Sequence, residues 1–232
     1  MPRDFEDHCW KDVVDAETLQ IYRDLWTRDT YVGERPAMIV VDLYNSAYEG
    51  GPLPVGEANK LSPGSCGKYA WDAIEPTKRL FAAVRAAGIP IVHLTRAVRP
   101  GVDQVQSTAR PIQSRNTAPF AIREDFAPLP GELVIHKELA SGFFGTPLGP
   151  YLRKMEVDSL IICGQSTSGC VRATSWEGYS HGFHVTLVEE CCFDRSLISH
   201  KINLFDLHHK YADVMHLEDV LSAIEARKAR AA

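Results

Sequence analysis

Three side chains in this sequence combine a nucleophile, a proton acceptor and a cation: Cys170, Asp42 and Lys137. A cysteine thiolate attacks carbonyl carbons, and a neighbouring carboxylate can take the thiol proton and later deliver it to a leaving amine. A lysine ammonium can hold that carboxylate ionised and help to orient a substrate. Together the three side chains suit hydrolysis of a C–N bond through a covalent intermediate, provided that the fold brings them together.

Each of these residues lies at or just beyond the end of an apolar run that predicts a β-strand. Asp42 ends the run 37–42, Lys137 ends the run 132–137, and the run 159–163 leads through GQSTSGC to Cys170. Taken singly, each residue has a simpler explanation, as a buried thiol, a capping carboxylate or a surface charge. Their joint placement favours function, because ligands of parallel sheets bind beyond the carboxyl ends of the strands. The other five cysteines are interpreted mainly as structural.

The position of Cys170 suggests how its thiol is activated. A helix is predicted from about residue 169 to 181, so Cys170 lies at or near its start. A helix N-terminus carries partial positive charge and free N–H groups, so we expect a lowered pKa for this thiol. The same N–H groups can form an oxyanion hole.

The remaining pattern predicts the elements that must position these groups. Further strands are expected at 91–95, 184–189 and 214–216, and helices at 74–87, 148–155, 199–211 and 218–228. Apolar strands that alternate with helices predict an α/β three-layer sandwich, with a central, mostly parallel sheet and helices on both faces. Residues 45–67 and most of 97–131 are rich in turn formers and are expected to be loops, and the segments 45–67 and 101–130 are expected to cover the pocket.

Residues 1–35 precede the first predicted strand and form a separate arm. Apolar spacing from Val13 to Trp26 predicts a helix capped by Asp15, which we expect to pack on the domain or on a neighbouring subunit. The domain proper is then 36–232.

Composition excludes several classes of protein. The formal net charge is -5, from 25 basic and 30 acidic residues, which argues against a nucleic-acid partner. No run approaches the ~20 apolar residues of a membrane span, and the polar, acidic start is unlike a signal peptide. The six cysteines are therefore expected as thiols in the cytoplasm, and they lack the CxxC spacing of a structural zinc site.

Several motifs resemble one family, in order along about 36–222. IVVD (39–42), HK (136–137) with SGFFGT (141–146), and GQSTSGCVR (164–172) are similar to the isochorismatase-like cysteine hydrolases, a Rossmann-like fold. EECCFDR (189–195) and the segments after it are similar to the branch of N-carbamoylsarcosine amidase and maleamate amidase.

The resemblance implies a catalytic triad of Asp42, Lys137 and Cys170. It also implies a cis peptide between Gln165 and Ser166, and an oxyanion hole formed by the N–H groups of Ser166 and Cys170. Many relatives have Thr where this chain has Ser166, a mild departure because the backbone supplies the donor.

The branch further implies that Arg195 binds a substrate carboxylate, for which a guanidinium fork is suited. The alternative for Arg195 is an ion pair with Asp194 or Glu190, and Arg172 is interpreted mainly as a helix-surface or subunit contact. The other candidates for the substrate pocket are Gln165 and the aromatic residues Tyr44, Tyr48, Phe143 and Trp176.

Neither a catalytic metal nor another cofactor is expected. The segment around His93 lacks the Asp/His/His pattern of nicotinamidases, so His93 is interpreted as a core or loop histidine. The nucleophile Cys170 argues against vinyl-ether hydrolysis of the isochorismatase type.

The function expected from the resemblance is ammonia release from a small linear ureido or amide compound that bears a carboxylate. An N-carbamoyl amino acid such as N-carbamoylsarcosine is the first choice, with maleamate and then biuret-type compounds as alternatives. A catalytically silent binding module of the same fold is the non-enzymatic alternative, although the complete triad disfavours it. A homotetramer is expected.

Overall fold

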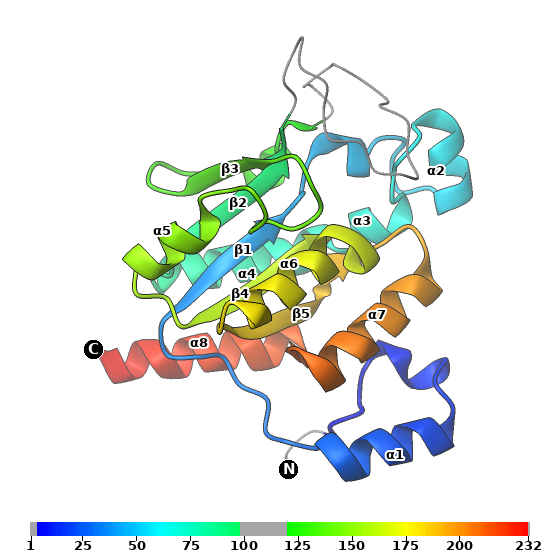
Figure 1. Cartoon of the computed structure of the whole chain (residues 1–232). Coiled ribbons are helices and arrows are strands. Elements are labelled where there is room, and N and C mark those ends of the chain that lie inside the picture. The colour runs from blue at the N-terminus through cyan, green and yellow to red at the C-terminus, as the bar shows by residue number, and fades with distance from the viewer. Residues whose placement is uncertain (1–3, 98–119, 232) are drawn as a thin grey trace.

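The computed structural model describes residues 4–97 and 120–231 and contains one six-stranded sheet (Figure 1). All paired strands are parallel, and their order is β3-β2-β1-β4-β5-β6. The strands are β1 (Pro36–Val41), β2 (Ile91–Arg96), β3 (Leu133–Lys137), β4 (Ser159–Gln165), β5 (His184–Phe193) and β6 (Asp213–Met215). The order reverses between β1 and β4, which is where parallel sheets open a crevice for ligands.

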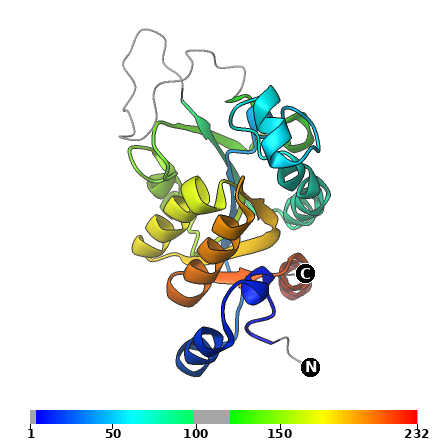
Figure 2. The same cartoon turned by 90° about the vertical axis from the view of Figure 1, so that its right-hand side faces the viewer.

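Helices cover both faces of the sheet (Figure 2). One face packs against α4 (Ile74–Ala86) and α8 (Leu217–Ala231), and the other against α5 (Leu148–Lys154), α6 (Arg172–Ser180) and α7 (Leu197–Lys210). Met38 and Val40 point into the first layer, whereas Ile39 and Val41 point into the second. This explains why β1 is a continuous apolar run, and it confirms the predicted three-layer α/β fold.

The predicted N-terminal helix is present, and it starts directly after the predicted cap, Asp15. It is α1 (Ala16–Trp26), and the Asp15 carboxylate caps it by accepting a hydrogen bond from Thr18 N at 2.8 Å. None of the residues of α1 is buried. The segment is held instead by the turn η1 (Cys9–Asp12), whose Trp10 is fully buried in the second layer.

Two predictions about loops and strand ends were wrong. The segment 45–67 contains a short turn, η2 (Asn45–Ala47), and a helix, α2 (Val55–Leu61), and it leads into α3 (Lys68–Asp72). These helices are too short to show a clear period between their flanking Gly and Pro residues. The strand β5 continues to Phe193, so Cys191 and Cys192 lie inside it rather than after it. Most of the predicted loop 97–131 lies outside the described residues, but its end forms η4 (Glu124–Phe126).

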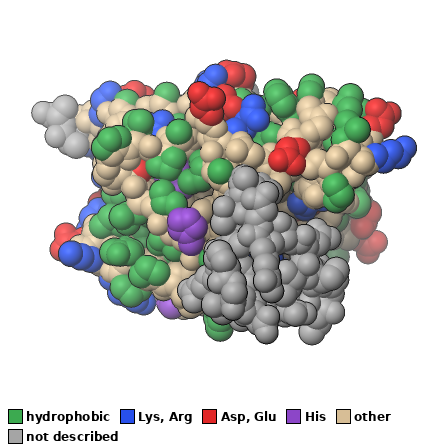
Figure 3. All heavy atoms as spheres, turned by 90° about the horizontal axis from the view of Figure 1, so that it is seen from above, with side chains coloured by type: hydrophobic (Ala, Val, Ile, Leu, Met, Phe, Trp, Pro, Cys, Tyr) green, Lys and Arg blue, Asp and Glu red, His purple; other side chains and the backbone are tan. Residues whose placement is uncertain are grey.

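In the described part of the chain, no helix is long and apolar enough to cross a membrane. Seen from above, hydrophobic side chains alternate with scattered acidic and basic ones over the described surface (Figure 3).

Candidate active site

Asp42 directly follows the central strand β1 and is almost fully buried. Its φ of 54° lies in the left-handed region, which is uncommon for a residue with a side chain. Two contacts fix this backbone: Asp42 N donates to Leu94 O at 3.0 Å, and Asp42 O accepts from Gln165 Nε2 at 3.0 Å. The carboxylate is therefore held at the crevice end of β1.

Lys137 connects the carboxylate to the thiol. It ends β3, two strands away from β1, and its side chain is buried. The Nζ atom donates to Asp42 Oδ2 at 2.8 Å, to Cys170 Sγ at 3.3 Å and to Leu139 O at 3.3 Å. The structure thus brings together the three residues that the sequence singled out.

Cys170 lies in a π-helical turn, η5 (Thr167–Val171), between β4 and α6. The carboxylate of Asp194, at the end of β5, accepts hydrogen bonds from both Ser168 N (2.8 Å) and Ser168 Oγ (2.7 Å). Thr167 Oγ1 lies 2.8 Å from His200 Nδ1 of α7. The turn is therefore attached to the end of β5 and to α7, which fixes the position of the thiol. The peptide bond Gln165–Ser166 is cis, as the resemblance implied.

The expected fall in the pKa of Cys170 is wrong for the free protein. Burial, and next the nearby Asp42 carboxylate, raise the pKa of the thiol to about 12, although Lys137 acts in the opposite direction. A negative neighbour and loss of water outweigh any effect of the helix N-terminus. Burial also opposes the charge on Lys137, but Asp42 and then Cys170 outweigh it and raise the pKa of the ammonium. The site therefore rests as a thiol beside an ion pair.

One oxygen of the Asp42 carboxylate, Oδ1, is available to take part in the reaction. Among the described residues, the buried Asp42 Oδ1 has no hydrogen-bond partner, whereas Oδ2 is bonded to Lys137. A buried carboxylate oxygen normally has a partner. An orphaned oxygen beside a thiol can accept the thiol proton.

Arg195 points at the cysteine turn rather than at either acidic neighbour. Its Nε donates to Gly64 O at 2.8 Å and its Nη1 to Ser166 Oγ at 3.0 Å. Only its backbone N contacts Asp194, at Oδ1 (2.7 Å). The alternative of an ion pair with Asp194 or Glu190 is therefore not what the described residues show. By contrast, Arg172 bonds to Asn203 and Asp206 on α7, a contact between helix surfaces.

The remaining pocket candidates divide into two groups. Tyr44 lies beside the triad: burial, and then the charges of Asp42 and Cys170, raise the pKa of its hydroxyl, and its ring makes an edge contact with Phe120. Tyr48, Phe143 and Trp176 are placed elsewhere. Tyr48 and Phe143 are core residues, Phe143 stacks on His181, and Trp176 on α6 is half exposed.

Sequence reasoning missed the segment 62–67 as a support for the site. Cys66 Sγ donates to Gln165 Oε1 at 3.3 Å, while the same Gln165 amide holds the backbone of Asp42. Gly64 O anchors Arg195. No periodicity marks these residues, and the turn-forming composition of SPGSCG predicted only a loop.

His93 is a core histidine, as predicted. It is buried, and its Nε2 lies 2.8 Å from Glu132 Oε2. The described residues contain one group of His and carboxylate side chains close enough to hold a metal ion, and it shares no member with the triad: His8, Glu189 and His216.

Two characterised amidohydrolases are similar to this chain in sequence. The chain is 31% identical over 210 residues to maleamate amidohydrolase of Pseudomonas putida, which covers 88% of this chain and 93% of that enzyme. It is 30% identical over 204 residues to N-carbamoylsarcosine amidase of Arthrobacter sp., with coverage of 84% and 73%. An isochorismatase family protein of Burkholderia thailandensis has the same fold, with a TM-score of 0.71 at 22% identity and coverage of 85% and 100%.

The family itself is settled by the extent of one match. The isochorismatase domain profile covers residues 36–219, from the first strand into the last helix. The predicted resemblance is confirmed, and the chain is a hydrolase of the isochorismatase family.

Proposed function

We propose that this chain is an amidohydrolase that releases ammonia from a small, linear ureido or amide compound bearing a carboxylate. The observation that carries the proposal is the position of Lys137 Nζ, in contact with both Asp42 Oδ2 and Cys170 Sγ. A buried ammonium between a carboxylate and a thiol keeps the carboxylate ionised and favours the thiolate as it forms.

In the first half of the reaction, Asp42 Oδ1 takes the thiol proton as Sγ attacks the carbonyl carbon. The oxyanion of the tetrahedral intermediate accepts hydrogen bonds from the backbone N–H groups of Ser166 and Cys170, as the family resemblance implies. Asp42 then returns its proton to the leaving nitrogen. The C–N bond breaks, ammonia leaves, and the acyl or carbamoyl group stays on sulfur.

In the second half, water attacks the thioester or thiocarbamate while Asp42 removes a proton from it. Collapse of this intermediate breaks the C–S bond, and the thiol regains a proton from Asp42. The product is a carboxylic acid from an amide, or a carbamic acid from a ureido group. Lys137 keeps its charge throughout and balances whichever of its two partners is negative.

The surroundings of Arg195 favour a substrate that bears a carboxylate. Its guanidinium is fixed by Gly64 and Ser166 within the site's own backbone turns, and it forms no ion pair with a described acidic residue that would neutralise it. The relatives named for maleamate, N-carbamoylsarcosine and ureidoacrylate share a carboxylate and a terminal NH₂–C(=O) group in their substrates. An N-carbamoyl amino acid is our first choice. Maleamate is the alternative, and the 31% identity to maleamate amidohydrolase supports it. Biuret, which has no carboxylate, is disfavoured.

The test is an ammonia-release assay with N-carbamoylsarcosine, maleamate, ureidoacrylate, biuret and nicotinamide. We expect Cys170→Ala and Cys170→Ser to abolish turnover with the fold intact, while Cys191→Ala, a buried thiol of β5, keeps it. Substantial ammonia release by Cys170→Ala would refute the mechanism. Binding of a substrate to the wild-type chain without any turnover would instead identify a binding module.

A second variant tests the carboxylate site separately. Arg195→Gln should raise KM for the carboxylate-bearing substrates by ~10–100-fold, because a charge-assisted hydrogen bond contributes about 1.5–3 kcal/mol. Arg172→Gln is the matched control, because its guanidinium bonds to α7. An unchanged KM in Arg195→Gln would remove this residue from substrate binding.

Two expectations from the sequence also continue as proposals. These are a cytoplasmic location and a homotetramer. Light scattering on the purified chain measures the second.

A further inference from the structure

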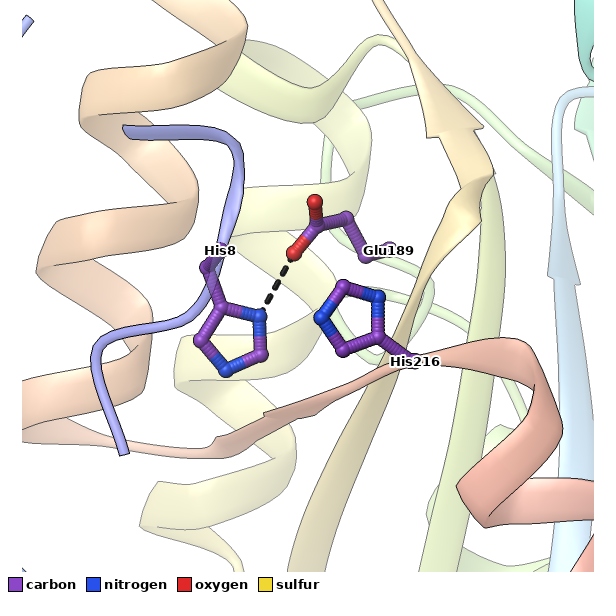
Figure 4. A group of neighbouring side chains, drawn as sticks. All are labelled: His8, Glu189 and His216. Atoms are coloured by element: carbon purple, nitrogen blue, oxygen red, sulfur yellow. Dashed lines mark hydrogen bonds and ion pairs between the residues drawn. The ribbon is translucent and has the colours of Figure 1, made fainter. Parts of the chain in front are cut away.

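Three segments that are far apart in the sequence meet where the N-terminal segment crosses the end of the sheet (Figure 4). His8 precedes η1, Glu189 belongs to β5, and His216 directly follows β6. One ligand atom from each residue lies within 4.8 Å of the others, and His8 Nδ1 is 2.6 Å from Glu189 Oε2. The rings of His8 and His216 are stacked, with centroids 4.9 Å apart and planes 9° apart.

An irregularity in β5 places the acidic residues of this group. While β4 advances two residues from Ile162 to Gly164, its partner β5 advances five, from Leu187 to Cys192. Extra residues of this kind re-aim side chains within a sheet. Here they allow two consecutive residues to face the same group of side chains. Glu189 contacts His8, and Glu190 contacts His216.

Both Glu189 and His216 have an outer partner that orients them. Glu190 Oε1 lies 2.7 Å from His216 Nδ1, and its other oxygen accepts from Leu217 N at 2.8 Å. Glu189 Oε1 accepts from Cys9 N at 3.0 Å. A carboxylate on one imidazole nitrogen is the usual outer partner of a metal-bound histidine, because it fixes the ring and leaves the second nitrogen for the metal. In His216 that second nitrogen is Nε2, which lies 2.6 Å from Asp7 O.

The group is also open to solvent from one side. His8 and His216 both line a cavity of about 860 Å³ between the N-terminal segment, residues 27–33 and α8. An ion in this cavity therefore has a path to the two histidines.

We propose that His8 Nδ1, Glu189 Oε2 and His216 Nε2 form a Zn²⁺ site that fastens the N-terminal segment to the sheet. Two imidazoles and one carboxylate are ligands that Zn²⁺ accepts, with a fourth position left for water or Asp7 O. Ligand atoms around tetrahedral zinc lie roughly 3.3 Å apart, given bonds of about 2.0–2.1 Å. The present spacings, 2.6 Å for His8 to Glu189 and at most 4.8 Å overall, bracket that value, so side-chain adjustment is sufficient.

Metal binding would change one contact of His216 and keep the other. Nδ1 of His216 lies 2.7 Å from Glu190 Oε1, and this contact persists when Zn²⁺ binds. The ion takes Nε2, which now lies 2.6 Å from Asp7 O. The competing explanation is that His8, Glu189 and His216 only form hydrogen bonds that hold the N-terminal segment, and have no affinity for metal.

The experiment titrates the full-length chain with ZnCl₂ by calorimetry at pH 8, after removal of metals with EDTA and dialysis. We expect one Zn²⁺ per chain, in the Cys170→Ala variant as well, which excludes the reactive thiol as the ligand. Affinity should fall by ~100-fold or more in His8→Ala, and by ~10–100-fold in Glu190→Gln, which removes only an outer partner. His181→Ala, an exposed histidine of another surface, should bind like the wild type.

A spectroscopic readout keeps the test decisive if a variant folds poorly. Co²⁺ added to the wild-type chain should give visible d–d absorption bands that Zn²⁺ displaces and that His8→Ala lacks. Circular dichroism of each metal-free variant checks that the fold is retained. Equal zinc affinity in the wild type and in a folded His8→Ala variant would overturn the proposal, as would the absence of stoichiometric binding to the wild type.

Discussion

Replacing Lys137 by Met tests the buried ion pair at the centre of the site. The side chains of Lys137 and Asp42 are only 4% and 3% exposed, and their charged atoms are 2.8 Å apart. Removal of one member of such a pair costs about 3–5 kcal/mol, because the other charge is left buried without a partner. In Lys137→Met the Asp42 carboxylate is left buried without its cation, and the thiolate that forms during the attack loses its positive neighbour. We therefore expect kcat/KM to fall by ~10²–10⁴-fold.

A double variant with substitutions at both Lys137 and Asp42 separates the effect of charge on stability from the effect of packing. Asp42→Asn alone should also destabilise the chain by a few kcal/mol, because it leaves the ammonium of Lys137 unpaired. Lys137→Met with Asp42→Asn removes both charges, so its loss of stability should be smaller than the sum of the two single losses, by at least ~1 kcal/mol. This difference isolates the interaction between the two residues.

The assay is urea unfolding followed by circular dichroism, with ammonia release measured in parallel. Lys154→Met, an exposed lysine at the end of α5, is the matched control and should stay within about 0.5 kcal/mol of the wild type. If the two single losses simply add in the double variant, the pair is not coupled. If Lys137→Met keeps full turnover, the ammonium has no part in activating the site.

Three further results are expected. Alkylation of Cys170 by iodoacetamide, followed by peptide mass spectrometry, should show no titration midpoint below pH 10, because burial and the Asp42 carboxylate raise its pKa to about 12; a midpoint near pH 8 would contradict this. Gly164→Ala should lower the melting temperature by several degrees more than Gly182→Ala: both have positive φ, but only at Gly164 would the added Cβ lie 2.0 Å from a backbone oxygen, that of Val41. Burial opposes the charged form of Glu132, yet its hydrogen bonds with Arg85 and His93 lower its pKa to about 2. Its contribution to stability is therefore complete above about pH 4.5 and is lost as the pH falls towards 2, so the urea midpoints of wild type and Glu132→Gln should lie closer together at pH 3 than at pH 7.

The sequence predicted those parts of the fold that follow from local patterns. Continuous apolar runs identified all six strands, because both faces of a parallel sheet are buried. The same rule placed Asp42, Lys137 and Cys170 at one edge of the sheet. The end of β5 was missed because its irregularity puts Glu189 and Glu190 where a strand pattern would require apolar residues.

Features that depend on contacts between distant segments were beyond the sequence. The link from Cys66 through Gln165 to Asp42 joins three segments, and no spacing encodes it. The pKa of Cys170 was misjudged for the same reason: the helix start was visible in the sequence, but the depth of burial and the distance to Asp42 were not. Phe143 was a pocket candidate by residue type alone, and packing decided otherwise.

The order of the strands has a consequence for the chain during its synthesis. β1 pairs on one side with β4, where Pro36 lies opposite Ser159, a residue 123 positions later (159 − 36). At ~5–20 residues per second, the ribosome adds that partner about 6–25 s after β1 itself. Until then Asp42 has no thiol beside it, because Cys170 follows β4, so the nascent chain carries no assembled nucleophile. The N-terminal segment reaches its final contacts later still, because His8 contacts Glu189, which lies 181 positions further along the chain. The first part of the protein to be made is thus among the last to find its place.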